Sequence, residues 1–336
     1  MPSARVFREF RGGGSHERFG ETAAVFCKSR FGNWKKENQM DIIKKYGDVI
    51  RQKTETDPQK ALRMFRFGFG VEYQKASKLA DKQLPYGYRE IYKAAVKNTR
   101  EVLEEPQKSV WTNIFGPVEI FQCFGLNPTS LEMLAGFMSG FRTEDYFIDR
   151  AQSIGIAPTL CSYHKHFLGT VESGVMPSPA FIAVTSAACD GNINTMRYAA
   201  LRRGMKFFAV DVPHEDSEEA VRYVASQLYP THLSIGSESA LRLFQILAED
   251  IKKYPEKEMN RIMWIHLLPY YQETLRKYFN LSDQNYINVY DLPLDYMEEM
   301  DARRPVEAIA RKMIRNVYNG DFSRKTDMIS DLIEEF

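Results

Sequence analysis

The 336-residue sequence has few cysteines and no long apolar run, and each absence excludes a class of protein. The cysteines are Cys27, Cys123, Cys161 and Cys189. They are too few for a disulfide framework, and no CxxC pair suggests a zinc finger. No apolar run approaches the roughly 20 residues of a membrane-spanning helix, and the N-terminus lacks the apolar core of a secretory signal. We expect a cytoplasmic protein with no membrane partner, whose cysteines are buried small side chains or soft metal ligands.

The sequence also lacks an excess of charge of one sign and the common nucleotide-binding motifs. Its formal net charge is +1, which gives no reason to expect nucleic acid or an anionic membrane as a partner. The patterns G-x-x-x-x-G-K-[ST] and G-x-G-x-x-G are missing, so we do not expect the chain itself to hydrolyse a nucleotide. No serine occupies a G-x-S-x-G elbow, which argues against a hydrolase.

The first third of the chain has the pattern of an arm followed by helices. Residues 1–33 are rich in glycine and arginine and have few apolar periods, which indicates an arm. From about Asn38 to Glu104 apolar residues recur at helical spacing, and Asp57-Pro58 is typical of a helix start. We therefore assign residues 1–105 to an arm and a helical segment.

Beyond Pro106 the pattern changes to alternating strands and helices. A short apolar segment, Val118–Phe124, precedes a helix start with a capping pattern at Thr129–Glu132. Short apolar runs that are typical of buried strands follow one another along the chain. They are Ile156–Leu160, Phe181–Ser186, Lys206–Val212, Arg261–His266 and Tyr286–Tyr290. Helices are expected from a cap at Asp190 to Gly204, after Asp216–Glu219, and at Ala240–Tyr254, Val306–Tyr318 and Ser323–Glu335. Such alternation predicts parallel sheets in right-handed βαβ units.

We predict an α/β protein with two Rossmann-like parallel-sheet domains preceded by the helical segment. The first domain covers residues 106–230 and carries Cys161 and Cys189, and the second covers residues 231–336. The last helix has no strand after it, so we expect the second domain to lack its C-terminal strands.

Cys161 and Cys189 lie at matching places in this pattern, because each follows a short apolar run and precedes a helical segment. Ligands of open α/β sheets bind outside the carboxyl ends of the strands, so we expect both thiols to face one crevice. A helix N-terminus there favours a thiolate or an anionic cluster. The alternative is two buried small side chains, which is what we expect of Cys123, while Cys27 on the arm receives no role.

Several other side chains could reach this crevice. His164 and His166 are alternate residues of a helix and point about 200 degrees apart, which favours a solvated pair with one ring turned toward the crevice. Glu119 could be a buried carboxylate near the same crevice, although a surface or capping carboxylate is the simpler interpretation. His214 and His266 fall at strand ends and are further candidates.

Several stretches resemble the 2-hydroxyacyl-CoA dehydratase subunit family, which also includes benzoyl-CoA reductase subunits and double-cubane cluster proteins. They are GPVEIFQCFGLNP, the cysteine turns LCSYHKHFLG and ACDGNINTMRYAALRRG, and FFAVDVPHE. The resemblance covers roughly residues 110–336, and the order of a Cys turn, Cys-Asp-Gly and Asp-Val-Pro is specific to the family.

The resemblance implies two Rossmann-like domains with an iron–sulfur cluster, of the [4Fe-4S] type, held by three cysteines in the cleft between them. Cys161 and Cys189 match the first and second ligands, and Glu119 and His164 are the candidate catalytic residues. The third ligand of the family lies on a late strand beyond the helix that matches Ser323–Phe336, where this sequence ends. In the family a single low-potential electron reduces the thioester carbonyl, and the resulting ketyl radical expels the 2-hydroxyl group.

The predicted function is therefore the iron–sulfur subunit of an anaerobic, ATP-activated radical dehydratase that converts a 2-hydroxyacyl-CoA to an enoyl-CoA. The expected partners are a paralogous subunit in a heterodimer, a separate ATP-hydrolysing iron–sulfur activator and the acyl-CoA substrate. Two alternatives stay open at this point. The chain could belong to a related low-potential reductase of an aromatic acyl-CoA or a small molecule, or it could be a non-catalytic partner subunit.

Overall fold

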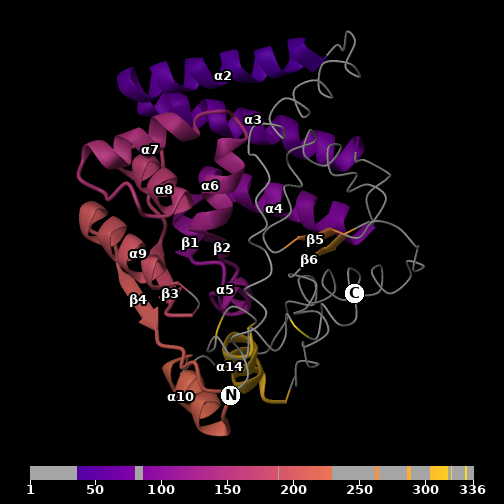
Figure 1. The fold of residues 1–336 in the computed structure, drawn as a ribbon, viewed down its shortest axis with the longest axis vertical. Coiled ribbons are helices and arrows are strands. Elements are labelled where there is room, and N and C mark those ends of the chain that lie inside the picture. The colour runs from indigo at the N-terminus through magenta and orange to yellow at the C-terminus, as the bar shows by residue number, and fades with distance from the viewer. Residues whose placement is uncertain are drawn as a thin grey trace, which may run out of the picture. The chain divides into compact units, whose positions relative to one another are not determined.

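The computed structural model describes residues 36–79, 86–187, 189–228, 262–264, 286–288, 303–316, 319 and 330 (Figure 1). The chain divides into two compact units, Met1–Lys45 and Tyr46–Phe336, and the site described below lies in the second. Within the described residues, no helix is both long enough and apolar enough to span a lipid bilayer.

A helical segment precedes the sheet, as predicted from its apolar spacing. Its helices are α2 (Lys36–Thr56), α3 (Pro58–Lys78) and α4 (Tyr86–Glu104). The predicted start at Asp57-Pro58 is confirmed, since the Asp57 side chain accepts a hydrogen bond of 3.0 Å from the Lys60 backbone N–H and Pro58 occupies the first helical position. Phe65 and Phe69 of α3 bury their rings against Phe141 in edge-to-face contacts.

The α/β prediction is confirmed by a four-stranded parallel sheet in the order β2-β1-β3-β4. Its strands are β1 (Ser109–Thr112), β2 (Asn127–Ser130), β3 (Phe181–Thr185) and β4 (Phe207–Val210). A second parallel pair joins β5 (Ile262–Trp264) to β6 (Tyr286–Asn288), where the sequence predicted strands. In the larger sheet the chain passes from β1 to β2 on one side and from β3 to β4 on the other, so the order reverses between β1 and β3.

Helices cover both faces of this sheet. They are α5 (Val118–Cys123), α6 (Leu131–Ser139), α7 (Glu144–Ser153), α8 (Ser162–Glu172), α9 (Asp190–Arg203), α10 (Glu218–Leu228) and α14 (Pro305–Ile314). Trp111 and Ile182 pack in one apolar cluster with residues of α6, α7, α8 and α9. Their strand neighbours Val110 and Ala183 pack in a second cluster with residues of α5, α10 and α14. Alternate strand residues point to opposite faces, so the two clusters are the two sides of a doubly wound sheet.

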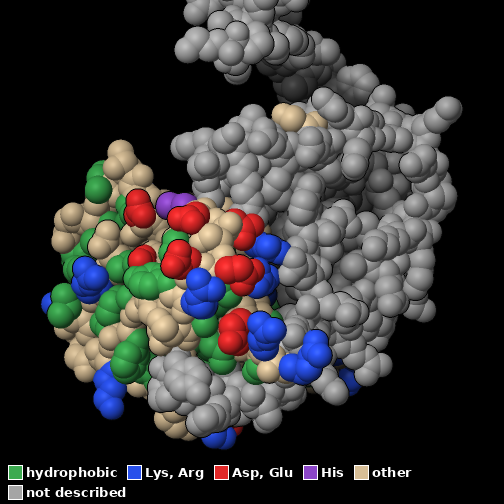
Figure 2. Space-filling view, turned by 90° about the horizontal axis from the view of Figure 1, so that it is seen from below, with side chains coloured by type: hydrophobic (Ala, Val, Ile, Leu, Met, Phe, Trp, Pro, Cys, Tyr) green, Lys and Arg blue, Asp and Glu red, His purple; other side chains and the backbone are tan. Residues whose placement is uncertain are grey.

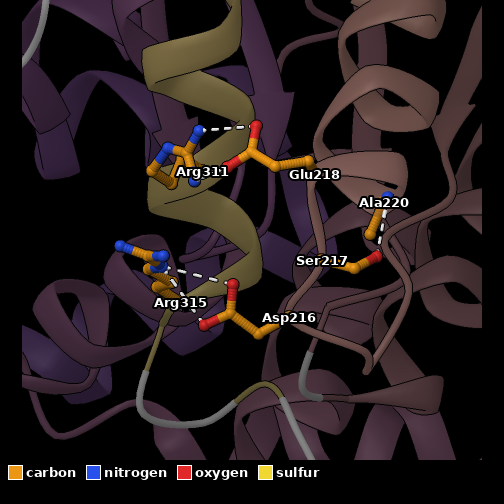
Figure 3. Close-up of polar contacts among 6 residues, drawn as sticks. All are labelled: Asp216, Ser217, Glu218, Ala220, Arg311 and Arg315. Atoms are coloured by element: carbon orange, nitrogen blue, oxygen red, sulfur yellow. Dashed lines mark hydrogen bonds and ion pairs between the residues drawn. The ribbon is translucent and has the colours of Figure 1, made fainter.

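Helix α14 comes from the segment assigned to a second domain, yet it packs on the same face as α5 and α10. Arg311 pairs with Glu218, and Arg315 pairs with Asp216, just before α10 (Figure 3). In the space-filling view from below, acidic and basic side chains of the described residues lie next to one another (Figure 2). The predicted boundary at residues 230 and 231 stays a prediction.

The helix termini confirm two local predictions and shift a third by one residue. The capping box predicted at Thr129–Glu132 does start a helix, but the N-cap of α6 is Ser130, which accepts a hydrogen bond of 3.1 Å from the Met133 N–H. Ser217 accepts one of 3.1 Å from the Ala220 N–H at the start of α10. Gly204 ends α9 in the left-handed region with φ of 64°, where a side chain would be strained.

Two local predictions are wrong. Residues 156–160 form no strand but a loop, because Gly155 turns the chain with φ of 96° and Pro158 has no N–H to give to a ladder. The N-cap of α9 is Cys189, and Asp190 is its first helical residue. The predicted helices Ala240–Tyr254 and nearly all of Ser323–Glu335 lie outside the described residues.

Candidate functional site

The site begins at the carboxyl ends of β1 and β3, where the strand order reverses. Asn113, directly after β1, is fully buried and bridges the two strands with its side chain. Its Oδ1 accepts a hydrogen bond of 3.0 Å from the Thr185 N–H, and its Nδ2 donates one of 3.3 Å to the Thr185 carbonyl. The Asn113 side-chain amide thus takes the place of backbone hydrogen bonds between β1 and β3 at the point where the two strands separate. Such a reversal is where open α/β sheets bind ligands.

Cys189 follows β3 and is the N-cap of α9, where its thiol is half-buried. Burial raises the pKa of the Cys189 thiol, and the nearby charges of Glu132 and Cys161 act in the same direction. The backbone amides of Gly191 and Asn192 oppose this shift, as expected of free N–H groups at a helix start. Cys189 therefore sits where helix amides can stabilise an anion, within electrostatic reach of Cys161.

Cys161 is the N-cap of α8, and its side chain is exposed. Both cysteines precede helices, as predicted, but only Cys189 follows a strand. The loop before Cys161 is held by Lys165, whose buried Nζ donates a hydrogen bond of 2.6 Å to the Pro158 carbonyl. The matching strand-end positions predicted for the two thiols are therefore wrong for Cys161, for the same reason that residues 156–160 form no strand.

His164 and His166 are both buried, so the prediction of a solvated pair is wrong. His164 does turn toward the site, since its Nε2 lies 3.9 Å from Cys189 Sγ and its Nδ1 lies 2.7 Å from Thr195 Oγ1. His166 packs edge-on against Phe147, with ring centroids 5.3 Å apart. Neither ring nitrogen of His166 has a partner among the described residues, and burial lowers its pKa to about 4. The packing of α8 between α7 and α9 buries both faces of this turn.

Glu132 and Asn192 are site residues that the sequence analysis missed. Glu132 lies in the first turn of α6, and burial raises its pKa, while the backbone amide of Glu132 and the side chains of Ser130 and Asn192 oppose the shift. Its Oε2 is buried and has no hydrogen-bond partner among the described residues. Asn192, in the first turn of α9, is fully buried. A signal was present, because both polar residues follow strand ends at helix starts, where the two cysteines were sought.

Glu119, predicted as a candidate catalytic residue, lies in the first turn of α5 and is buried, so the surface interpretation is wrong. Its Oε1 accepts a hydrogen bond from the Lys312 ammonium of α14. Its Oε2 is buried without a partner among the described residues. Its catalytic role stays a prediction.

The remaining candidates are not placed in the site. His214 is exposed on the segment between β4 and α10. His266, Cys27 and the side chain of Cys123 lie outside the described residues.

The described residues offer part of a ligand set for a metal cluster. Among them, no group of three or more His, Cys, Asp or Glu side chains could hold a metal ion. The two thiols of Cys161 and Cys189 are soft donors at helix N-termini, which suits an anionic iron–sulfur cluster. That Cys161 and Cys189 are the first and second ligands of such a cluster stays a prediction.

Comparison with known proteins finds a family model that matches the part of the chain carrying most of these features. Residues 113–231 match the family model described as 2-hydroxyglutaryl-CoA dehydratase, D-component. The matched region begins at Asn113 and includes Cys161, Cys189 and the whole of α10. No curated protein matches the chain.

Proposed function

We propose that this chain, whose family match supports membership of the 2-hydroxyacyl-CoA dehydratase family, is one component of a dehydratase that removes water from a 2-hydroxyacyl-CoA. The family suggests a dehydratase-type subunit, and a D-component implies a partner component. In the proposal Cys161 and Cys189 supply two ligands of a [4Fe-4S] cluster. An ATP-hydrolysing activator protein supplies the electron.

The observation that supports this proposal most is the placement of two thiols at the N-termini of α8 and α9, two helices that pack against each other. Helix N-termini stabilise negative charge through their free N–H groups and the helix dipole. A structural pair of small buried side chains would not require an exposed thiol at Cys161. The pair therefore suits binding of an anionic group.

The chain's own residues would bind and orient the reacting groups. When bound, the cluster would supply a low-potential electron and a Lewis-acidic position for a substrate oxygen. The exposed Cys161 and the half-buried Cys189 would be two of its ligands. Glu119, whose Oε1 is paired with Lys312 and whose buried Oε2 has no partner among the described residues, is the proposed carboxylate that exchanges a proton with the substrate.

Anaerobic purification of the full chain with its partner component tests the proposal. We expect iron and acid-labile sulfide in the complex, and conversion of a 2-hydroxyacyl-CoA to the enoyl-CoA once the activator, ATP and a reductant are added. A complex that lacks iron and sulfide would instead support the non-catalytic subunit. A loaded complex that reduces an aromatic acyl-CoA and leaves 2-hydroxyacyl-CoA unchanged would support the reductase.

A further inference from the structure

Helix α14 brings a lysine to a buried carboxylate that lies 193 residues earlier in the chain. The Lys312 ammonium donates a hydrogen bond to Oε1 of Glu119, in the first turn of α5. The second oxygen of this carboxylate, Oε2, is buried and has no partner among the described residues. The side chain of Glu119 is 12% exposed and that of Lys312 is 30% exposed. The lysine therefore holds one oxygen of the carboxylate and leaves the other for a further contact.

The start of α5 is tied to the sheet edge where the site lies. The Gly116 N–H donates a hydrogen bond of 2.9 Å to the carbonyl of Asn113, directly after β1. A Cβ at Gly116 would overlap Thr112 Oγ1, so the tight turn after β1 requires glycine. Asn113 also bridges β1 to β3 through its side chain. The helix that carries Glu119 thus begins at the carboxyl ends of the central strands.

Helix α14 does not depend on Lys312 for its place on the sheet. Its buried apolar residues pack in the cluster with α5 and α10, and they are Val306, Ile309, Ala310, Met313 and Ile314. Arg311 adds an ion pair with Glu218 of α10, whose side chain is 66% exposed (Figure 3). Lys312 thus pairs with a buried carboxylate, whereas the preceding residue of the same helix pairs with an exposed one.

The lysine should determine how the Glu119 side chain is oriented. A carboxylate that is buried without a partner is costly, so in the absence of Lys312 the side chain would turn toward water or toward another donor. Proton transfer requires the two groups to lie within hydrogen-bond reach, and a small misplacement of a reacting group can lower a rate about 100-fold. The position of Oε2 therefore depends on the contact that holds Oε1.

We infer that Lys312 is a positioning residue for Glu119, because by holding Oε1 it presents Oε2 as the oxygen that exchanges a proton with the substrate. This inference rests on the proposed function, in which Glu119 is the proton-exchanging carboxylate. In this transfer Oε2 takes up the proton that the substrate carbon releases. The resulting carboxylic acid gives the proton to the departing hydroxyl group, which leaves as water. Lys312 acts through Glu119 alone, so a residue of α14 completes a site that begins at β1.

The inference is tested by steady-state dehydration of 2-hydroxyglutaryl-CoA and 2-hydroxyhexanoyl-CoA, with the anaerobically loaded complex, activator, ATP and reductant. We expect Lys312→Met to lower kcat by about 10–100-fold and to change KM by less than about twofold. Lys312→Arg should restore most of kcat, because a guanidinium can still donate to Oε1. Lys312→Gln has a shorter side chain and should show the same fall, which provides a second variant if Lys312→Met does not fold.

Arg311→Met is the matched control. Arg311 neighbours Lys312 on α14, and their side chains are 25% and 30% exposed, but the carboxylate that Arg311 pairs with is exposed. This variant should keep the kcat and KM of the wild type. Iron content and the midpoint of urea unfolding are measured for each variant, and we expect Lys312→Met to keep the iron of the wild type. A fall in kcat that merely follows a loss of iron overturns the inference.

A double-mutant cycle shows whether Lys312 acts through Glu119. In the Glu119→Gln background, Lys312→Met should cause no further fall in kcat. The inference is overturned, and the dehydratase proposal stands, if kcat falls by the same factor in both backgrounds or if Lys312→Met keeps the wild-type kcat. A Glu119→Gln complex as active as the wild type has the same consequence. A wild-type complex that converts neither substrate overturns the proposed function itself, and the inference with it.

Discussion

The starts of α8 and α9 carry the same type of residue, a cysteine N-cap, in two different settings. Cys161 is exposed and ends a loop that Lys165 holds by a single hydrogen bond to the Pro158 carbonyl. Cys189 is half-buried, follows a central strand and contacts the ring of His164. One thiol is thus fixed by the sheet and its neighbours, whereas the other is presented by a surface loop. In the proposed site Cys189 would therefore be the rigidly held ligand, and Cys161 would be the ligand open to solvent.

Replacement of Gly169 should disturb the packing of α8 and give the largest loss of stability among these predictions. A Cβ there would overlap the carbonyl oxygen of Phe147, and the backbone of α7 cannot move aside as a flexible side chain could. We expect Gly169→Ala to lower the free energy of unfolding by about 3 kcal/mol or more, measured by urea denaturation. Gly70→Ala is the control: nothing lies within 4 Å of a Cβ there. It should instead stabilise its helix by about 0.5–1 kcal/mol. Equal stabilities would refute the close packing of α7 on α8.

His166 should make the same helix sensitive to acid. The pKa of His166 is about 4 in the folded state and about 6.5 in the unfolded state. On acidification the unfolded state therefore takes up the proton first. The contribution of the neutral His166 ring to the free energy of unfolding is complete above about pH 6.5. It is lost as the pH falls to about 4, and the total loss is about 3 kcal/mol. His166→Leu should remove this loss, whereas His214→Leu at an exposed position should keep it. Denaturation curves between pH 7 and pH 4 that match for wild type and His166→Leu would contradict this account.

Asn113 tests the strand that supports Cys189. Asn113→Ala removes both side-chain bonds to Thr185 and leaves a buried N–H unpaired, so we expect a loss of about 2 kcal/mol in unfolding free energy. The exposed Asn194→Ala serves as the control and should change it by less than about 0.5 kcal/mol. If thermal and urea unfolding of the two variants agree, the bridge between β1 and β3 contributes nothing.

Lys165 gives the smallest expected effect and sharpens the contrast between the two thiols. Lys165→Met keeps the buried stem and loses the bond to Pro158, at a cost of about 1 kcal/mol. The loosened loop should let iodoacetamide alkylate Cys161 faster and leave the rate for Cys189 unchanged, as read by mass spectrometry of the peptides. Lys206→Met, at an exposed position, should change neither rate. A parallel rise at both cysteines would show that the loop does not act on Cys161 alone.

Much of the fold could be predicted from local chemistry. The Asp57-Pro58 start and the Gly204 stop depend on residues a few positions apart, and both are confirmed; the helix start predicted at Thr129–Glu132 is off by one residue. The strand predicted at Ile156–Leu160 is wrong because the prediction relied on apolar content and disregarded Gly155 and Pro158. These two residues prevent a regular ladder of backbone hydrogen bonds. The pattern of apolar residues indicates which segments are buried. It does not indicate whether their backbone can form the hydrogen bonds of a strand.

The site could be predicted less completely, because its contacts join distant segments. Cys161 and Cys189 stand out as helix-start cysteines, but the approach of His164 to Thr195 across α8 and α9 follows from packing that the sequence does not display. The burial of His166 depends in the same way on α7 lying against α8. Side chains 31 residues apart, such as His164 and Thr195, become neighbours only once the helices have packed together.

We expect Cys161 and Cys189 to act as one ligand pair despite their different settings. The most direct test is the iron content of the anaerobically assembled complex in a double-mutant cycle of Cys161→Ser and Cys189→Ser, with Cys27→Ser as the control. Because a cluster loses its hold when either ligand is removed, each single variant should lose nearly as much iron as the double variant, and the control should lose none. Single variants that retain iron, or losses that simply add in the double variant, would contradict a shared site.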